Sequence, residues 1–163
     1  MCSVLRQIDE KQAKSLLKNP DDVFDFVDEE VLTDEELDLD KTWHGIHFLL
    51  TNTVWEGEEP LCFLVRGGQE VGNEDHDVGY GPARILRQPE VAAFAHALAA
   101  IEVAEFKNRY NAENLSKQEI YPEVWNDEDS AENRSWLADG FEQLREFISR
   151  SANSNKALLI WLQ

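Results

Sequence analysis

The sequence predicts a single α+β domain, in which about six helical segments pack against a small mixed sheet of about four short strands. The chain has 163 residues, a length typical of one domain. Apolar residues recur at three- and four-residue steps in several segments, as they do in amphipathic helices. The stretch 157–162 is an almost continuous apolar run, which suits a strand buried on both faces at the centre of a sheet. We therefore expect residues 1–163 to form one domain.

The first fifty residues predict one strand followed by three helices. Val4–Ile8 is short and partly apolar, and Asp9 after it is a favoured N-cap residue, so a strand and then a helix are expected. Apolar residues at near-helical spacing predict a second helix within 21–32. The strongest helical pattern covers Leu39–Leu50, and its apolar arc is wide enough to predict a largely buried helix.

The rest of the chain predicts three further strands or extended segments and several helices, separated by glycine- and proline-bearing loops. In order, the expected elements are a strand at Leu61–Val65, a loop at 69–81, a short extended segment at 83–86, a helix beginning at Pro89, a helical segment at 103–110, a packed aromatic loop at 120–125, a long amphipathic helix around 136–148 and the strand at 157–162.

Charge is the clearest compositional property, because 15 basic residues face 33 acidic ones and the formal net charge is −18. The field of such a molecule repels phosphates, so nucleic acid and anionic membranes are not expected as partners. Eleven acidic residues and no Lys or Arg lie between Asp21 and Asp40. This run is either a solvated face or a surface that captures a basic protein partner, with Asp21, Asp25, Asp28 and Glu29 as its candidate residues.

The compartment expected from the sequence is the cytoplasm. No apolar run approaches the length of a membrane span, and the N-terminal residues lack the pattern of a signal peptide. The two cysteines, Cys2 and Cys62, form no metal-binding spacing and no disulfide framework, so both are expected to be reduced. No cofactor is predicted.

Three titratable residues fall close together on a helical wheel drawn over Leu39–Leu50. Asp40 lies one turn before His44, and His44 and His47 are three residues apart, so a carboxylate could orient an imidazole. One interpretation is a metal half-site or an acid–base pair at the mouth of a pocket. The alternative is that His47 is a hydrogen-bonded histidine of the core wall and that Asp40 caps the helix. No metal site is predicted with these three residues alone, because the pattern lacks the Glu of an H-E-x-x-H motif.

Tyr80 and Arg84 are further candidates for a ligand site. Arg84 could hold a carboxylate or phosphate of a ligand, and Tyr80 could donate a hydrogen bond. The alternative is that Arg84 pairs with the many carboxylates of the chain and that Tyr80 fills the core.

Several motifs spread over nearly the whole chain resemble those of the YfbM-like bacterial proteins, which carry a domain of unknown function. The resemblance rests on Leu39–Leu50, Gly79–Arg84, Pro89–Val91, Ile120–Pro122 and Trp125, in that order. It implies a small cytoplasmic α+β domain from bacteria and no established activity. The N-terminus differs, since the family pattern opens with a longer apolar strand than Met1–Val4 provides. The positions that match the family pattern are Asp40, Lys41, Trp43, His44, His47, Tyr80, Arg84, Tyr121 and Trp125.

Two classes of function remain open from the sequence. The favoured hypothesis is a non-catalytic module that captures a basic protein partner through its acidic surface, as an immunity protein does. The alternative is a small-molecule enzyme or sensor with a site around Asp40, His44 and His47, with or without a metal ion. The sequence leaves the oligomeric state open.

Overall fold

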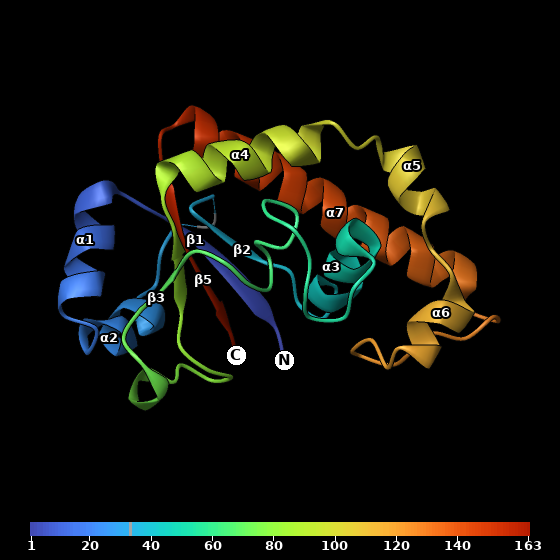
Figure 1. The fold of residues 1–163 in the computed structure, drawn as a ribbon, viewed down its shortest axis with the longest axis horizontal. Helices are drawn as coiled ribbons and strands as arrows, with labels where there is room; N and C mark the ends of the chain where they lie inside the picture. Colours follow the sequence, from blue (N-terminus) through green and yellow to red (C-terminus); the bar gives the residue numbers. More distant parts are fainter. Residues whose placement is uncertain (33) are drawn as a thin grey trace.

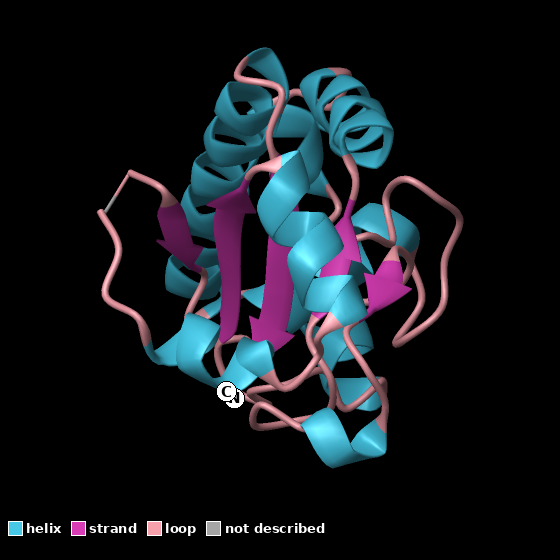
Figure 2. Ribbon diagram, turned by 90° about the vertical axis from the view of Figure 1, so that its left-hand side faces the viewer, coloured by secondary structure: helices cyan, strands magenta, loops and turns pink. Residues whose placement is uncertain are grey.

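A five-stranded sheet runs through the protein in the order β2-β1-β5-β4-β3, and every neighbouring pair is antiparallel. The structure is a computed structural model that describes residues 1–32 and 34–163. The strands are β1 (Ser3–Ile8), β2 (Glu36–Asp38), β3 (Gln69–Glu70), β4 (Arg84–Leu86) and β5 (Ala157–Leu162). Figure 2 shows the two chain ends close together at one edge of the domain.

The C-terminal strand β5 occupies the centre of the sheet, as its apolar sequence predicts. It pairs with β1 over its whole length and with β4 over three residues. Alternate side chains enter opposite cores: Leu158 and Ile160 join the larger apolar cluster, and Leu159 and Trp161 join the smaller one. Because both faces of β5 are buried, the sheet needs a helical cover on each side.

Helices cover the two faces unequally (Figure 1). The smaller core lies under α1 (Glu10–Lys18) and α2 (Asp22–Asp28), and Asp9 caps α1 in a capping box as expected. The larger core lies under α3 (Trp43–Thr51), α4 (Gln88–Ala99), α5 (Val103–Asn108), α6 (Ala112–Lys117) and α7 (Ser130–Asn153), and a short 3-10 helix, η1 (Glu74–His76), lies in the β3–β4 connection. None of the helices in the described ranges has both the length and the apolar character that crossing a membrane requires.

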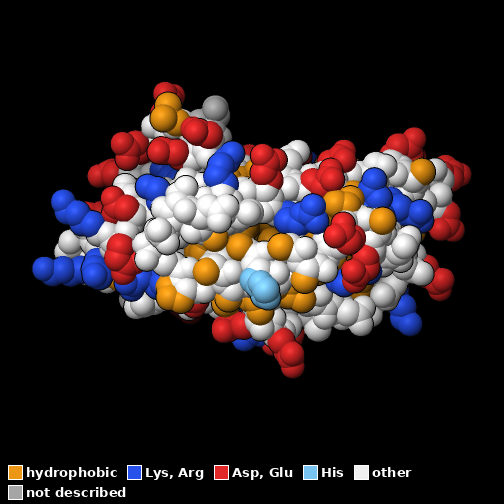
Figure 3. Space-filling model, turned by 90° about the horizontal axis from the view of Figure 1, so that it is seen from above, with side chains coloured by type: hydrophobic (Ala, Val, Ile, Leu, Met, Phe, Trp, Pro, Cys, Tyr) orange, Lys and Arg blue, Asp and Glu red, His pale blue; other side chains and the backbone are white. Residues whose placement is uncertain are grey.

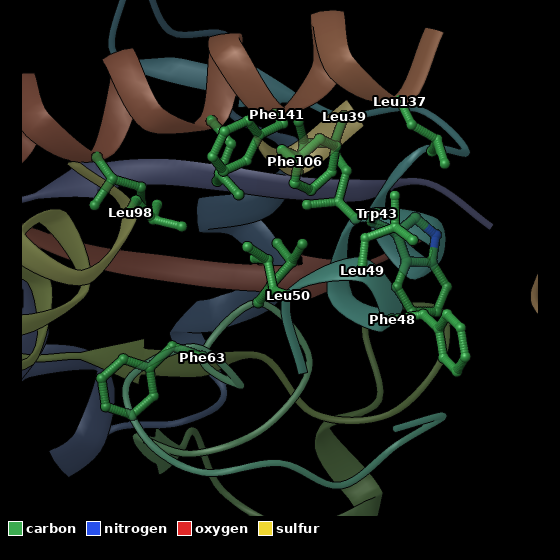
Figure 4. Close-up of a cluster of buried hydrophobic side chains, with 14 of the residues drawn as sticks. Leu39, Trp43, Phe48, Leu49, Leu50, Phe63, Leu98, Phe106, Leu137 and Phe141 are labelled. Carbon is green, nitrogen blue, oxygen red and sulfur yellow. The ribbon is translucent and has the colours of Figure 1, made fainter. Parts of the chain in front are cut away.

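Helix α3 is the most deeply buried helix, since all eight residues from Trp43 to Leu50 are buried. Figure 4 shows its apolar side chains together with Leu137 and Phe141 of α7 and Phe106 of α5. The rings of Phe106 and Phe141 stack with their centroids 4.2 Å apart. The prediction of a buried helix is confirmed, but the helix begins at Trp43 rather than at Leu39.

The α+β class is confirmed, while the number and direction of the strands differ in detail from the prediction. The described chain has seven α-helices and five strands, and the sheet is antiparallel rather than mixed. Leu61–Val65 was predicted as a strand but forms consecutive turns, in which the carbonyl of Cys62 accepts from the N–H groups of Val65 and Arg66. The short edge strands β2 and β3 were not predicted, because two or three residues carry no readable periodicity.

Glycine permits the close approach of α3 to α7. A Cβ atom on Gly140 of α7 would lie 2.8 Å from Oγ1 of Thr42 and 3.0 Å from Cδ1 of Ile46. We expect Gly140→Val to lower the free energy of unfolding by about 1–3 kcal/mol, because overpacking forces the two helices apart. Chemical denaturation measures this loss. Ser135→Val on the exposed face of α7 is the matched control, and an equal loss in both variants would contradict close packing as the cause.

Candidate functional site

The predicted polar arc of Asp40, His44 and His47 does not form. Because α3 begins at Trp43, Asp40 precedes the helix, in a left-handed backbone conformation with φ of 47°. Its carboxylate is exposed and accepts a hydrogen bond from Sγ of Cys2 at 3.4 Å. Asp40 does not cap α3 either, since Thr42 is the N-cap residue. The helical wheel was therefore wrong for its first turn, because residues 40–41 form a turn and the helix begins only at Trp43.

His44 uses both ring nitrogens to hold two loops. The ring is 1% exposed. Its Nδ1 atom accepts from the backbone N–H of Tyr121 at 3.1 Å, so Nε2 carries the proton and donates to the carbonyl of Val54 at 2.9 Å. The ring also stacks against Trp43 and against Trp55, at centroid distances of 4.9 and 4.4 Å. No lone pair is left for a metal ion or a substrate, so His44 positions the loops.

His47 lies deeper in the same core wall and is fully buried. Its Nε2 atom lies 3.4 Å from Oγ1 of Thr51, and Nδ1 has no hydrogen-bond partner among the described residues. Burial, followed by the proximity of His44, lowers the pKa of His47 to about 4. His47 is therefore neutral near pH 7. Within the described chain, no three His, Cys, Asp or Glu side chains are placed to hold a metal ion.

Tyr80 and Arg84, by contrast, line one cavity of about 260 Å³. The cavity lies where β3, β4 and the end of β5 meet the turns after residue 60. Its lining residues are Leu64, Val65, Glu70, Tyr80, Gly81, Pro82, Arg84, Ile160, Trp161 and Leu162. The structure thus brings together two of the five candidate ligand residues and separates them from Asp40.

The guanidinium group of Arg84 is held by backbone carbonyls. Its Nη1 donates to Gly67 at 2.9 Å and its Nη2 to Leu64 at 3.0 Å, and both approach the carbonyl of Phe63 at 3.3–3.4 Å. Burial lowers the pKa of Arg84 to about 10, so the group stays charged at neutral pH. No carboxylate of the described residues lies within ion-pair distance of Arg84, although a carboxylate partner was one expectation. Tyr80 does not fill the core, because 60% of it is exposed.

Glu70 is the lining residue that sequence reasoning missed. It lies directly opposite Arg84 in the pairing of β3 with β4, so the two side chains share one face of the sheet. The sequence placed Glu70 in a loop, because glycines surround it. The pair Gly67–Gly68 was the available signal, because Gly68 has a φ of 72° and a Cβ on it would lie 2.5 Å from the carbonyl oxygen of Ile85 in β4.

A second candidate site is the surface of α2 and the segment that follows it, which we call the α2 surface. Its carboxylates are those of Asp21, Asp22, Asp25, Asp28, Glu29 and Glu30. Asp21 lies 3.5 Å from Nε2 of His76, whereas the other five form no ion pair with a described residue. Two apolar side chains are exposed beside them, Phe24 at 40% and Leu32 at 68%.

Arg6 of β1 holds the end of α2 in place. Its guanidinium group donates to the carbonyls of Phe26, Val27 and Glu29 and forms an ion pair with Glu36 at 2.6 Å. A cation at a helix C-terminus stabilises the carbonyls that have no partner within the helix. No sequence pattern indicated this contact, which places a cation at the end of α2, where the last turn has no basic residue of its own.

Acid should destabilise the protein through its buried histidines. In the unfolded chain His47 titrates near 6.5 and in the folded protein near 4, so the unfolded chain binds more protons between these values. The stabilisation is complete above about pH 6.5 and is lost as the pH falls towards 4. Between pH 7.5 and 5 we expect a loss of about 2 kcal/mol from His47. Burial lowers the pKa of His44 in the same direction.

Urea denaturation at pH 7.5 and 5 tests this dependence. His47→Leu should lose less stability on acidification than the wild type, whatever its stability at pH 7.5. His96→Gln, at an exposed position of α4, is the matched control and should keep the wild-type dependence. The interpretation fails if His47→Leu and the wild type respond equally to pH.

Comparisons with known proteins place the chain in a family. The family model described as "Domain of unknown function (DUF1877)" matches residues 1–161. The fold is similar to that of "a Protein of Unknown Function YfbM from Escherichia coli", with a TM-score of 0.77, 23% sequence identity and 98% of each chain covered. The comparison with curated proteins finds no match. The resemblance seen in the sequence is thus confirmed, and the chain belongs to the YfbM-like DUF1877 family.

Proposed function

We propose that this protein is a binding module that captures a basic protein partner through the α2 surface. The observation that supports it most is the combination of unpaired carboxylates with exposed apolar side chains on one short segment. Asp22, Asp25, Asp28, Glu29 and Glu30 form no ion pair with described residues. These charges are therefore free to meet Lys and Arg side chains of a partner.

The exposed apolar side chains can contribute binding affinity that surface charge alone does not provide. Exposed carboxylate–ammonium pairs contribute little affinity, because water and salt screen them. Protein interfaces gain most of their affinity from a few aromatic or aliphatic anchors surrounded by polar residues. Phe24 and Leu32 are such exposed anchors beside the acidic run, and Phe24 also stacks on His76 with the centroids 6.3 Å apart.

The α2 surface is also fixed before any partner binds. Val23 packs into the smaller core, and Arg6 holds the carbonyls at the end of the helix. A surface whose backbone is already ordered has less conformational entropy to lose on association. The net charge of −18 adds a field that raises the rate of encounter with a basic partner at low salt.

The geometry gives less support to a small-molecule site at Asp40, His44 and His47 than to one at Tyr80 and Arg84. Asp40 lies away from the helix that holds the two histidines, and both nitrogens of His44 are occupied by backbone groups. The cavity lined by Tyr80 and Arg84 is separate from these three residues.

Charge reversal on the α2 surface tests the proposal. The variant carries Asp21→Lys, Asp25→Lys, Asp28→Lys and Glu29→Lys, and tagged protein is used to capture partners from a lysate of the source organism at low and high salt. We expect a basic protein that the wild type retains at low salt to be reduced at least tenfold with the variant, because attraction becomes repulsion. Mass spectrometry of the eluates measures the change.

The matched control changes four exposed acids elsewhere by the same total charge, at Asp127, Glu128, Glu142 and Glu146. Figure 3 shows that acidic side chains also surround the face over α4 and α7, so negative charge is not confined to the α2 surface. Equal loss of the partner in both variants would reduce the effect to net charge and contradict a site at α2. Phe24→Ser should weaken capture at constant charge.

A further inference from the structure

We propose that the cavity lined by Glu70, Tyr80 and Arg84 binds a free α-amino acid with an apolar side chain. The inference does not depend on the α2 surface, which belongs to the other face of the sheet. It rests on the placement of two opposite charges that share a cavity and yet do not pair with each other.

The charge of Arg84 lacks an ionic partner within the described chain. Four of its five N–H groups point to the carbonyls of Phe63, Leu64 and Gly67, whereas Nε donates to no described residue. The carbonyl dipoles satisfy the four N–H groups on Nη1 and Nη2 without cancelling the charge of the guanidinium group. A ligand carboxylate near Nε would supply both the missing acceptor and the missing negative charge.

Glu70 supplies the opposite charge on the same face of the sheet. It is the register partner of Arg84 in the β3–β4 pair, a position from which side chains normally touch. The two do not form an ion pair, and the guanidinium group of Arg84 donates to the turn carbonyls instead. A purely anionic ligand near Arg84 would be repelled by Glu70. A ligand that carries both a carboxylate and an ammonium group matches both charges.

The remaining lining selects an apolar side chain of modest size. Leu64, Val65, Ile160 and Leu162 contribute apolar walls, and Pro82 adds to them. A volume of about 260 Å³ lies just below the range of roughly 300–1,000 Å³ that is typical of drug-sized ligands. Tyr80 stands exposed at the same cavity, where its hydroxyl can donate to the ligand carboxylate. The ligand class is therefore that of leucine, isoleucine or methionine.

Calorimetric titration with L-leucine tests the inference directly. We expect saturable binding by L-leucine. N-acetyl-L-leucine lacks the ammonium group and L-leucine amide lacks the carboxylate, so each should bind at least tenfold more weakly. Absence of saturable binding by L-leucine, L-isoleucine and L-methionine at millimolar concentration would overturn the proposal. Equal binding of N-acetyl-L-leucine would also overturn it, because the site would then recognise only an anion.

Variants assign the binding to this cavity without disturbing Arg84, whose loss would leave three turn carbonyls unpaired. Glu70→Gln should weaken L-leucine binding about tenfold or more and leave the thermal midpoint of the free protein unchanged. Glu74→Gln, an exposed acid in the same connection but outside the lining, should bind L-leucine as the wild type does. If Glu70→Gln binds as tightly as the wild type, the ligand does not use this cavity. The α2 charge reversal should not change L-leucine binding, so this proposal and the proposed function can fail separately.

Discussion

Strand β5 is buried on both faces, and this burial sets the places of the other elements. A strand with apolar residues at successive positions cannot lie at an edge or face water on one side. The chain therefore returns from α7 to insert its last strand between β1 and β4, and helices close both faces. The N-terminal strand, the cavity at the end of β5 and the α2 surface all take their positions from this arrangement.

Buried polar side chains serve mainly to hold loops and turns whose backbone groups form no hydrogen bonds within a helix or a sheet. His44 connects α3 to the loops at Val54 and Tyr121 through both ring nitrogens. Arg6 and Arg84 do the same work with guanidinium groups, each satisfying carbonyls that no strand or helix uses. Such carbonyls would otherwise lose hydrogen bonds on burial, which costs about 1–3 kcal/mol each. The titratable residues that attract attention in the sequence are thus largely structural.

The two arginines differ in whether a carboxylate balances their charge. This difference distinguishes a structural contact at Arg6 from a candidate ligand site at Arg84. Arg6 lies 2.6 Å from Glu36 in addition to its carbonyl acceptors, so the carboxylate neutralises the charge of the guanidinium group. Arg84 has carbonyls alone, with Glu70 across the strand pair but unpaired and a cavity beside both. Two opposite charges that line a cavity without pairing can each be paired by a charged group of a ligand.

The amino-acid sequence was sufficient to predict the α+β class, the central strand, a buried helix within Leu39–Leu50 and the acidic character of the segment 21–30, because each depends on periodicity or composition over many residues. It could not determine where α3 begins, since a residue one turn before a helix reads the same on a wheel whether the chain is helical or bent there. Pairing of Glu70 with Arg84 was equally hidden, because a two-residue strand has no periodicity and its register depends on the neighbouring strand. Only the fold shows that His44 bonds to backbone groups rather than to Asp40, because its hydrogen-bond partners Val54 and Tyr121 lie in loops whose positions no helical pattern predicts.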